Sequence, residues 1–275
     1  MTLGTKIGAL DITVLIDSRL TFDPGIFTDT TAEHVNGLLK DAGVSEVQTH
    51  CNSYVIRSGE TVMMVDAGTG GLFGPTSGKL GEAMTEAGIK PADITHLFMT
   101  HLHPDHTAGA ITSDGKAVFP NAELMLLEAE RAFWVNDANF AGAPEDVLGW
   151  QGLAKGTVNA YKDRLKIVRD GEEIIPGVSV IGLPGHTPGH AGLRIESGGQ
   201  TLVHMADVVH VQDVQLSDPS LGVVFDVDGA QARRSRERAL DMLATDKLMV
   251  TGSHLRMPKF GQIVRHGSGY RYLDI

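Results

Sequence analysis

The chain has 275 residues, of which 42% are hydrophobic and 21% charged, so it can bury a core and is not a disordered protein. Its 23 basic and 34 acidic residues leave a net charge of −11, which argues against a nucleic-acid binder with a concentrated basic surface. No apolar stretch approaches the roughly 20 residues of a membrane span, and the first ten residues lack a signal-peptide pattern. We therefore expect a soluble, cytoplasmic protein. The single cysteine, Cys51, excludes an intramolecular disulfide and a zinc–thiolate cluster.

The first half of the chain is expected to be mostly strands. In chain order we expect a strand at 12–16, a long loop at 21–31, a hairpin of strands 54–57 and 61–65, a helix at 80–87 and a buried strand at 97–99. The helix is indicated by apolar residues at positions i, i+3, i+4 and i+7, and Gly88 ends it. The segment 118–159 mixes helical and loop patterns and stays unassigned.

The second half predicts another set of strands and one long helix. We expect a strand at 178–183, a hairpin of strands 193–196 and 201–205, a helix that Asp226 or Asp228 caps and that runs to about residue 243, and a strand at 247–251. No linker or low-complexity segment interrupts the chain, so we expect a single domain over 1–275.

The two predicted hairpins are similar in sequence. Each has a Ser-Gly turn, and an aspartate follows its second strand: Asp66 in the first hairpin and Asp207 in the second. Two unrelated hairpins can also look alike. If the similarity reflects a repeat, the domain consists of two facing halves, roughly 1–165 and 166–275, with these aspartates at related strand ends.

A cluster of histidines follows the predicted strand 97–99. His101, His103, Asp105 and His106 lie within six positions. In an extended loop the side chains of His101 and His103 project to the same side, and Asp105 and His106 can address a second ion a few ångströms away. The pattern predicts a binuclear metal site, and imidazole with carboxylate suits zinc as well as manganese, cobalt or iron.

Further metal ligands must come from elsewhere, because two histidines cannot complete a tetrahedral site. Three later strand ends offer candidates: His186 and His190 in a Pro-Gly-His-Thr-Pro-Gly-His run, His204 and Asp207 at the end of the second hairpin, and His254 after the last predicted strand. Such loops at strand ends are where α/β folds place their chemistry.

These motifs resemble the metallo-β-lactamase superfamily, whose signature is HxHxDH followed by a later His, Asp and His, and the resemblance extends over nearly the whole chain. It implies an α/β fold of the four-layer αββα type. It also implies two divalent ions, most simply zinc, with the following ligands: His101, His103 and His186 for one ion, Asp105, His106 and His254 for the other, and Asp207 between them. His186 rather than His190 takes the ligand role, because the family's ligand is the first histidine of the GHxxGH run.

A narrower resemblance is to the methyl parathion hydrolase subgroup, which contains phosphotriesterases with lactonase and arylesterase side activities. It rests on the segments 71–76, 207–210, 218–220 and 269–272. Acyl-homoserine lactonases of the superfamily typically carry a tyrosine three residues after the bridging aspartate, where this chain has His210. Characterised methyl parathion hydrolases are exported, whereas this chain shows no leader, which suggests a different physiological substrate.

The resemblance implies a hydrolase in which a metal-bridging hydroxide attacks the carbonyl carbon or phosphorus of a small neutral ester: a lactone, an aryl ester or an organophosphate triester. Asp105 and Asp207 are the expected catalytic carboxylates. Asp66 is expected to accept an imidazole N–H from a metal ligand, although an aspartate at this position could also simply cap a turn.

Three residues are candidates for the substrate pocket. Phe73 and Trp134 are expected as aromatic walls, and His210 as a hydrogen-bond donor to a substrate oxygen. The alternative for Phe73 and Trp134 is that they are ordinary core residues. The alternative for His210 is that it only caps a strand end.

Other functions stay open at this point. A β-lactamase or a glyoxalase II-like thioesterase would use the same scaffold. A di-iron oxidoreductase is disfavoured, because such relatives tend to replace a site histidine with a carboxylate and to carry a flavin domain. A non-catalytic binding module is disfavoured because all seven ligands are present. We expect no nucleic-acid or membrane partner, and the oligomeric state, a homodimer included, stays open.

Overall fold

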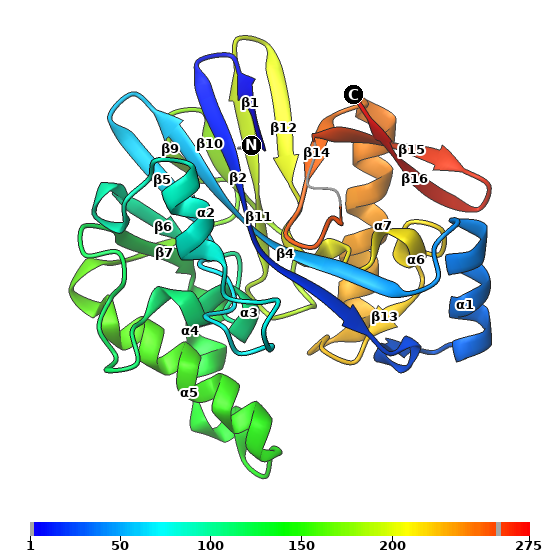
Figure 1. The fold of residues 1–275 in the computed structure, drawn as a ribbon, viewed down its shortest axis with the longest axis horizontal. Coiled ribbons are helices and arrows are strands. Elements are labelled where there is room, and N and C mark those ends of the chain that lie inside the picture. The colour runs from blue at the N-terminus through cyan, green and yellow to red at the C-terminus, as the bar shows by residue number, and fades with distance from the viewer. Residues whose placement is uncertain (1–2, 257–259) are drawn as a thin grey trace.

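The computed structural model describes residues 3–256 and 260–275. Two mixed sheets of seven strands each stack face to face, and helices cover their outer faces (Figure 1). The strand order is β1-β2-β4-β5-β6-β7-β8 in the first sheet and β16-β15-β14-β12-β11-β10-β9 in the second. The predicted four-layer αββα arrangement is confirmed.

The first sheet is built by the N-terminal part of the chain. Its strands are β1 (Leu3–Ile7), β2 (Leu10–Phe22), β4 (Val47–Ser58), β5 (Thr61–Val65), β6 (His96–Phe98), β7 (Glu123–Leu127) and β8 (Leu165–Val168). The helices that follow strands of this sheet are α2 (Leu80–Glu86), α3 (Pro104–Thr107), α4 (Glu128–Val135) and α5 (Glu145–Ala160). Pairing is antiparallel from β1 to β5 and parallel from β5 to β8.

The second sheet is built by the C-terminal part. Its strands are β9 (Glu173–Ile175), β10 (Val178–Gly182), β11 (Ala191–Ser197), β12 (Gln200–His204), β14 (Met249–Thr251), β15 (Gly261–His266) and β16 (Gly269–Asp274). The helices on this side are α1 (Ala32–Asp41), α6 (Gln212–Gln215) and α7 (Gly229–Asp246), and a short ladder joins β3 (Phe27–Thr28) to β13 (Gly222–Val223).

Separate clusters of buried apolar side chains hold the four layers together. Strand β5 shows how the period of two works: Met64 packs toward the helices of the first sheet, whereas Met63 and Val65 pack between the two sheets. On the far side, Leu240 and Leu243 of α7 pack against the second sheet. Because β5 is buried on both faces, its sequence is a continuous apolar run.

Both sheets repeat one arrangement. An antiparallel hairpin, β4–β5 or β11–β12, is followed along the sheet by a strand that pairs in parallel, β6 or β14. The two hairpins are those expected from the sequence. Strand β8 pairs with β7 in the first sheet, so the boundary between the sheets falls after Val168 rather than at 165/166.

Several expected elements differ in extent from those observed. Strand β2 continues through the start of the expected loop to Phe22, because it pairs with β4 past a bulge between Ile16 and Ser18. The unassigned segment 118–159 contains β7, α4 and most of α5. Helix α7 begins after Asp228, whose carboxylate accepts a hydrogen bond from the backbone N–H of Gln231 at 2.9 Å.

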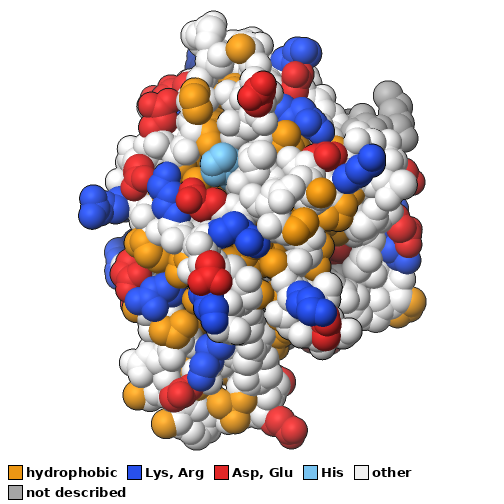
Figure 2. All heavy atoms as spheres, turned by 90° about the vertical axis from the view of Figure 1, so that its left-hand side faces the viewer, with side chains coloured by type: hydrophobic (Ala, Val, Ile, Leu, Met, Phe, Trp, Pro, Cys, Tyr) orange, Lys and Arg blue, Asp and Glu red, His pale blue; other side chains and the backbone are white. Residues whose placement is uncertain are grey.

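One face of the molecule mixes charges of both signs (Figure 2). Figure 2 shows lysine and arginine side chains interspersed with aspartate and glutamate on the face that carries α2, α4 and α5, without a basic field. Within the described parts of the chain, none of the helices combines the length and the apolar character needed to cross a bilayer.

Candidate metal centre

All seven predicted ligands lie together in loops at strand ends. His101 and His103 follow β6, Asp105 and His106 lie in α3, and His186, Asp207 and His254 follow β10, β12 and β14. Two groups, within each of which all potential ligand atoms lie within 4.8 Å of one another, together contain all seven: His101, His103 and His186; and Asp105, His106, Asp207 and His254. Two overlapping groups that meet the same criterion combine Asp207 with His101 and His190, or with His186 and His210. The pairing of these groups matches the ligand sets that the resemblance implied.

The first group brings three imidazole nitrogens into contact. Nε2 of His101 lies 3.0 Å from Nδ1 of His103, which lies 2.9 Å from Nε2 of His186. Burial, with the neighbouring histidines, holds the pKa of His101 and His103 well below the ordinary value. These imidazoles are therefore neutral, which is the form that binds a metal ion.

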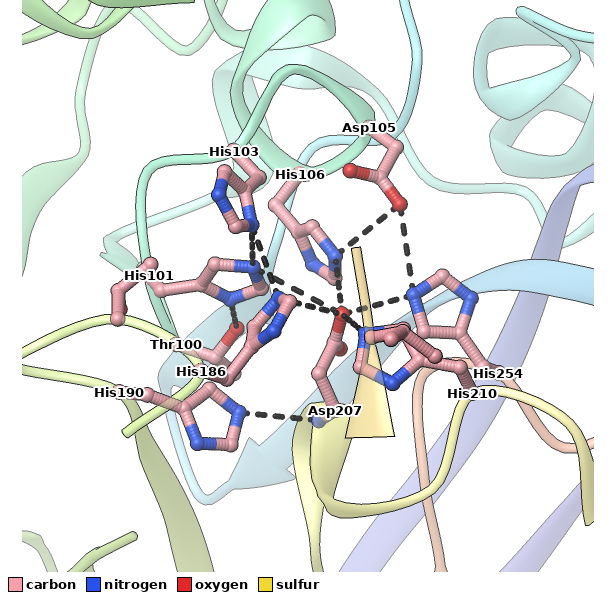
Figure 3. A network of polar contacts seen from close by, with 12 residues as sticks. Thr100, His101, His103, Asp105, His106, His186, His190, Asp207, His210 and His254 are labelled. Carbon is pink, nitrogen blue, oxygen red and sulfur yellow. Dashed lines mark hydrogen bonds and ion pairs between the residues drawn. The ribbon is translucent and has the colours of Figure 1, made fainter. Parts of the chain in front are cut away.

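Asp207 lies between the two groups (Figure 3). Its Oδ2 is 2.8 Å from Nε2 of His254, 3.2 Å from Nε2 of His106 and 3.6 Å from Nε2 of His186. Its Oδ1 is buried and has no hydrogen-bond partner in the described part of the chain. Asp207 follows Ala206, a non-glycine residue with φ of +47°. The backbone is therefore strained immediately before the residue that carries this carboxylate.

The second group is completed by Asp105. Its Oδ2 is 3.4 Å from Nε2 of both His106 and His254. The Asp105 side chain is 19% exposed and lines the pocket described below, whereas the Asp207 side chain is only 2% exposed. Asp105 therefore contacts both the metal centre and the space available to a substrate.

The outward-facing nitrogens of three ligands have hydrogen-bond acceptors of their own. Nδ1 of His106 lies 2.9 Å from Oδ2 of Asp66, Nδ1 of His186 lies 2.8 Å from Oδ1 of Asp226, and Nδ1 of His254 lies 2.7 Å from a backbone oxygen. A metal ion bound at Nε2 would leave the proton of each ring on Nδ1, where these acceptors hold it. Nε2 of His106 makes no hydrogen bond within the described residues, although the Asp105 and Asp207 carboxylates lie 3.4 and 3.2 Å away. A nitrogen and two carboxylates that face one another in this way fit a divalent ion between them, so the donor set fits two ions.

Asp66 makes the contact that the sequence predicted. Its carboxylate also accepts hydrogen bonds from the backbone N–H and the hydroxyl of Thr100, at 2.9 and 2.8 Å, and its φ is +58°. Asp66 and Asp207, which follow the second strands of the two similar hairpins, thereby approach the two nitrogens of one ring, that of His106. Asp226, by contrast, is predicted from the sequence only as a helix cap, because no spacing along the chain links it to His186.

His190 has a different role from His186. Its Nδ1 donates to the carbonyl of Leu183 at 2.7 Å, and its Nε2 accepts the backbone N–H of Asp207 at 3.0 Å. Burial lowers the pKa of His190 to about 4, so the ring is neutral. Because both nitrogens are occupied, His190 supports the backbone of Asp207 and has no lone pair left for a metal ion.

A pocket opens above the two metal-binding groups. Its walls are mainly apolar, and they surround the ligands and His210: Leu20, Phe22, Ile26, Phe73, Trp150 and Phe225. Phe73 and His210 lie where the sequence predicted, and neither nitrogen of His210 has a hydrogen-bond partner within the described residues.

The prediction for Trp134 is corrected. Trp134 is 2% exposed, belongs to the core between the first sheet and its helices, and donates its indole N–H to Glu130 at 2.7 Å. Trp150 of α5 forms the pocket wall instead. It lies in the segment 118–159, which shows no clear apolar periodicity, so its orientation could not be predicted.

Comparison with known proteins places the chain in a family. A profile of the Metallo-beta-lactamase superfamily matches residues 47–254. An N-acyl homoserine lactonase from a Bacillus species is 26% identical over 182 residues, which cover 59% of this chain and 64% of that protein. The alignment thus spans just under two thirds of the length of this curated relative.

Two solved structures match over the whole length. A hydrolase of the beta lactamase superfamily, AbOPH, has a TM-score of 0.91 and 28% identity, and the match covers 100% of this chain and 97% of that chain. AidC, a dizinc quorum-quenching lactonase in complex with the product N-hexanoyl-L-homoserine, has a TM-score of 0.93, 26% identity and the same coverage.

Proposed function

Because the chain belongs to the metallo-β-lactamase superfamily, we propose that it is a binuclear metal-dependent hydrolase that opens lactones and cleaves other neutral esters. One observation carries the proposal. Two groups of ligand atoms converge on a single oxygen of Asp207, beneath a pocket whose remaining walls are largely apolar.

The donor set supports two ions. His101, His103 and His186 would hold one, Asp105, His106 and His254 the other, and Asp207 both. Nitrogen and carboxylate ligands suit zinc, and the dizinc lactonase AidC shares the fold, so zinc is the proposed metal.

The residues around the ions have separable tasks in hydrolysis. Two bound dications would lower the pKa of a shared water and polarise the ester carbonyl. Asp105, which reaches both the ligand cluster and the pocket, accepts the proton of the attacking water and returns it to the leaving oxygen. His210 lines the pocket, and its ring nitrogens make no hydrogen bond within the described residues, although Nε2 lies 3.4 Å from Oδ2 of Asp207. His210 donates a hydrogen bond to the substrate oxygen that gains charge.

The pocket favours a neutral substrate with an apolar substituent. None of the described residues that line it is a lysine or an arginine, so a substrate carboxylate would find no cationic side chain there. Lactones, aryl esters and phosphotriesters all meet this requirement. The curated relative named as a lactonase favours lactones among them. Triesters are included as secondary substrates because the segments 71–76, 207–210, 218–220 and 269–272 resemble methyl parathion hydrolases in sequence.

The test is a substrate panel assayed after reconstitution with zinc, manganese and cobalt. It contains γ- and δ-lactones, p-nitrophenyl esters and paraoxon-like triesters. We expect kcat/KM for the best lactone to exceed that for any triester by more than ~100-fold, or about 2.7 kcal/mol in barrier. The reverse ranking would reassign the substrate, and a protein that binds no metal ion or hydrolyses no member of the panel would overturn the proposal.

A further inference from the structure

Glu130 of α4 is a fully buried carboxylate without a cationic partner. Its side chain is 0% exposed, and no ion pair involves it among the described residues. Burial raises the pKa of Glu130, while four hydrogen bonds oppose the shift. A buried carboxylate without a basic neighbour destabilises a fold unless its oxygens are fully hydrogen-bonded, and these four bonds meet that requirement.

The two oxygens of Glu130 bind two different loops. Oε1 accepts the backbone N–H of Leu102 at 2.8 Å, and Leu102 stands between His101 and His103. Oε2 accepts the hydroxyl of Thr187 at 2.6 Å and the backbone N–H of Gly189 at 3.0 Å, directly after His186. The groups bonded to the carboxylate are all hydrogen-bond donors, so both of its oxygens must be acceptors.

The contact between these segments is also close in space. A Cβ atom at Gly189 would overlap the backbone nitrogen of Glu130, so only glycine lets the His186 loop approach α4 this closely. Oε1 of Glu130 further accepts the indole N–H of Trp134, whose ring packs edge-on against His103 at 5.5 Å between centroids. One side chain therefore fixes His103 twice, through the backbone before it and through the ring beside it.

The other metal-binding group has no such link to Glu130. His106 is oriented by Asp66 and His254 by the backbone oxygen of His50, at 2.9 and 2.7 Å. The two groups thus have separate supports, and a change at Glu130 acts directly on only one of them.

We propose that Glu130 is a positioning residue that sets the separation of the His101–His103 loop from the His186 loop, and through it the affinity of these three histidines for their metal ion. The inference rests on the proposed binuclear function. Metal sites tolerate deviations of only about 0.2 Å in ligand distance, and loss of a residue that orients ligands typically weakens metal binding 10- to 100-fold.

The decisive variant is Glu130→Gln, which keeps the shape and replaces one acceptor oxygen by an NH₂ group. That group must face either the Leu102 and Trp134 donors or the Thr187 and Gly189 donors. We expect stepwise zinc dissociation constants, measured by competition with a chromophoric chelator, to show one site weakened 10- to 100-fold and the other within threefold of the parent. Anomalous diffraction from variant crystals at one zinc equivalent should place the retained ion at His106 and His254.

The matched control is Asp17→Asn. Asp17 is also a buried carboxylate that accepts several hydrogen bonds, from Ser18, from Thr69 and from the backbone N–H of Leu80, but it supports the loop that carries Phe73. We expect it to lower thermal stability and to leave both zinc affinities unchanged. Selective loss of the same site in this control would show that general destabilisation is sufficient, and would overturn the proposal.

A graded pair at Thr187 keeps the test decisive if Glu130→Gln fails to fold. Thr187→Val removes one donor to Oε2, whereas Thr187→Ser keeps it. We expect a selective loss of zinc affinity in the valine variant and near-parental affinity in the serine variant. Equal affinities in all variants of a parent that binds two ions would refute the role of Glu130 alone; a parent that binds no ion would refute the hydrolase proposal itself.

Discussion

The ring of His106 lies between two carboxylates, and this arrangement defines what each contributes. Asp207 approaches Nε2 from the metal side, and Asp66 approaches Nδ1 from behind. On the opposite side of the site, the Asp226 carboxylate contacts Nδ1 of His186, as the Asp66 carboxylate contacts Nδ1 of His106. The two supporting aspartates therefore contact members of different groups, and by our proposal each supports a different ion.

Replacement of each supporting aspartate by asparagine should weaken the binding of a different ion. Asp66→Asn should weaken the ion held by Asp105, His106 and His254, and Asp226→Asn the ion held by the three-histidine group, each by 10- to 100-fold. Elemental analysis after dialysis against graded chelator measures the retained metal, and crystals show which site holds it. If both variants lose the same ion, the division of the ligands into two sets is wrong.

His210 should affect turnover without affecting metal binding. His210→Phe keeps a ring to stack on His254, 5.2 Å away between centroids, and removes the hydrogen-bond donor. We expect kcat to fall about 10²-fold with two ions still bound, as for other donors to a developing oxyanion. The replacement His34→Gln, at a histidine outside the pocket, is the control and should leave kcat unchanged. Loss of metal in His210→Phe would instead identify His210 as a ligand.

The far end of β2 and the turn after β13 meet to form one wall of the pocket. Phe22 and Phe225 contribute rings 5.9 Å apart, and both line the cavity. This wall exists only because β2 continues past its bulge toward the second sheet's side of the molecule.

Phe225→Ala should distinguish substrates by their apolar substituent. Burial of apolar area contributes ~25 cal/mol per Å², so loss of part of this wall should lower kcat/KM about tenfold for an ester with a hexyl-length chain. An ester with a methyl group in its place should be nearly unaffected. Val224→Ala, at a neighbour that is 58% exposed and outside the pocket, is the matched control. An equal loss for both substrates would show that this wall does not bind the apolar substituent.

The sequence predicted those parts of the site that depend on spacing along the chain. The HxHxDH run defines four ligands because strand β6 delivers them into one loop, and the hairpin pattern placed Asp66 and Asp207 at related strand ends. Asp226, Glu130 and Trp150 could not be predicted, because their roles depend on which distant loop packs against them. Helix α5 shows the reason: it lacks a clear apolar period, and the sheet below it determines which of its faces points inward.

The two metal ions would join the sheets of the domain. One loop after β6 supplies four ligands, and three loops of the second sheet supply the others. Ligands that bind only the folded state stabilise it by RT ln(1 + [L]/Kd), about 4 kcal/mol when the free ion is at 1,000 times its Kd. Removal of the metal should therefore lower Tm by several degrees in calorimetry, and re-addition of zinc should restore it. An unchanged Tm, with metal loss verified by elemental analysis, would contradict this coupling.

His204 should make the stability of the metal-free protein depend on pH. Its ring is buried between the sheets, 4.7 Å from that of Tyr54, neither nitrogen has a partner among the described residues, and burial lowers its pKa to about 4. In the unfolded chain the same ring has a pKa near 6.5, so between pH 6.5 and 4 the unfolded state binds a proton that the folded state does not. Stability contributed by the neutral ring is complete above pH 6.5 and is lost as the pH falls through this window, by about 3 kcal/mol in total.

His204→Phe removes the titrating group and keeps an aromatic ring against Tyr54. We expect urea unfolding of the chelated proteins to show the parent losing more stability than the variant between pH 7 and pH 4.5, and a pH-independent difference would show that His204 does not titrate in this window.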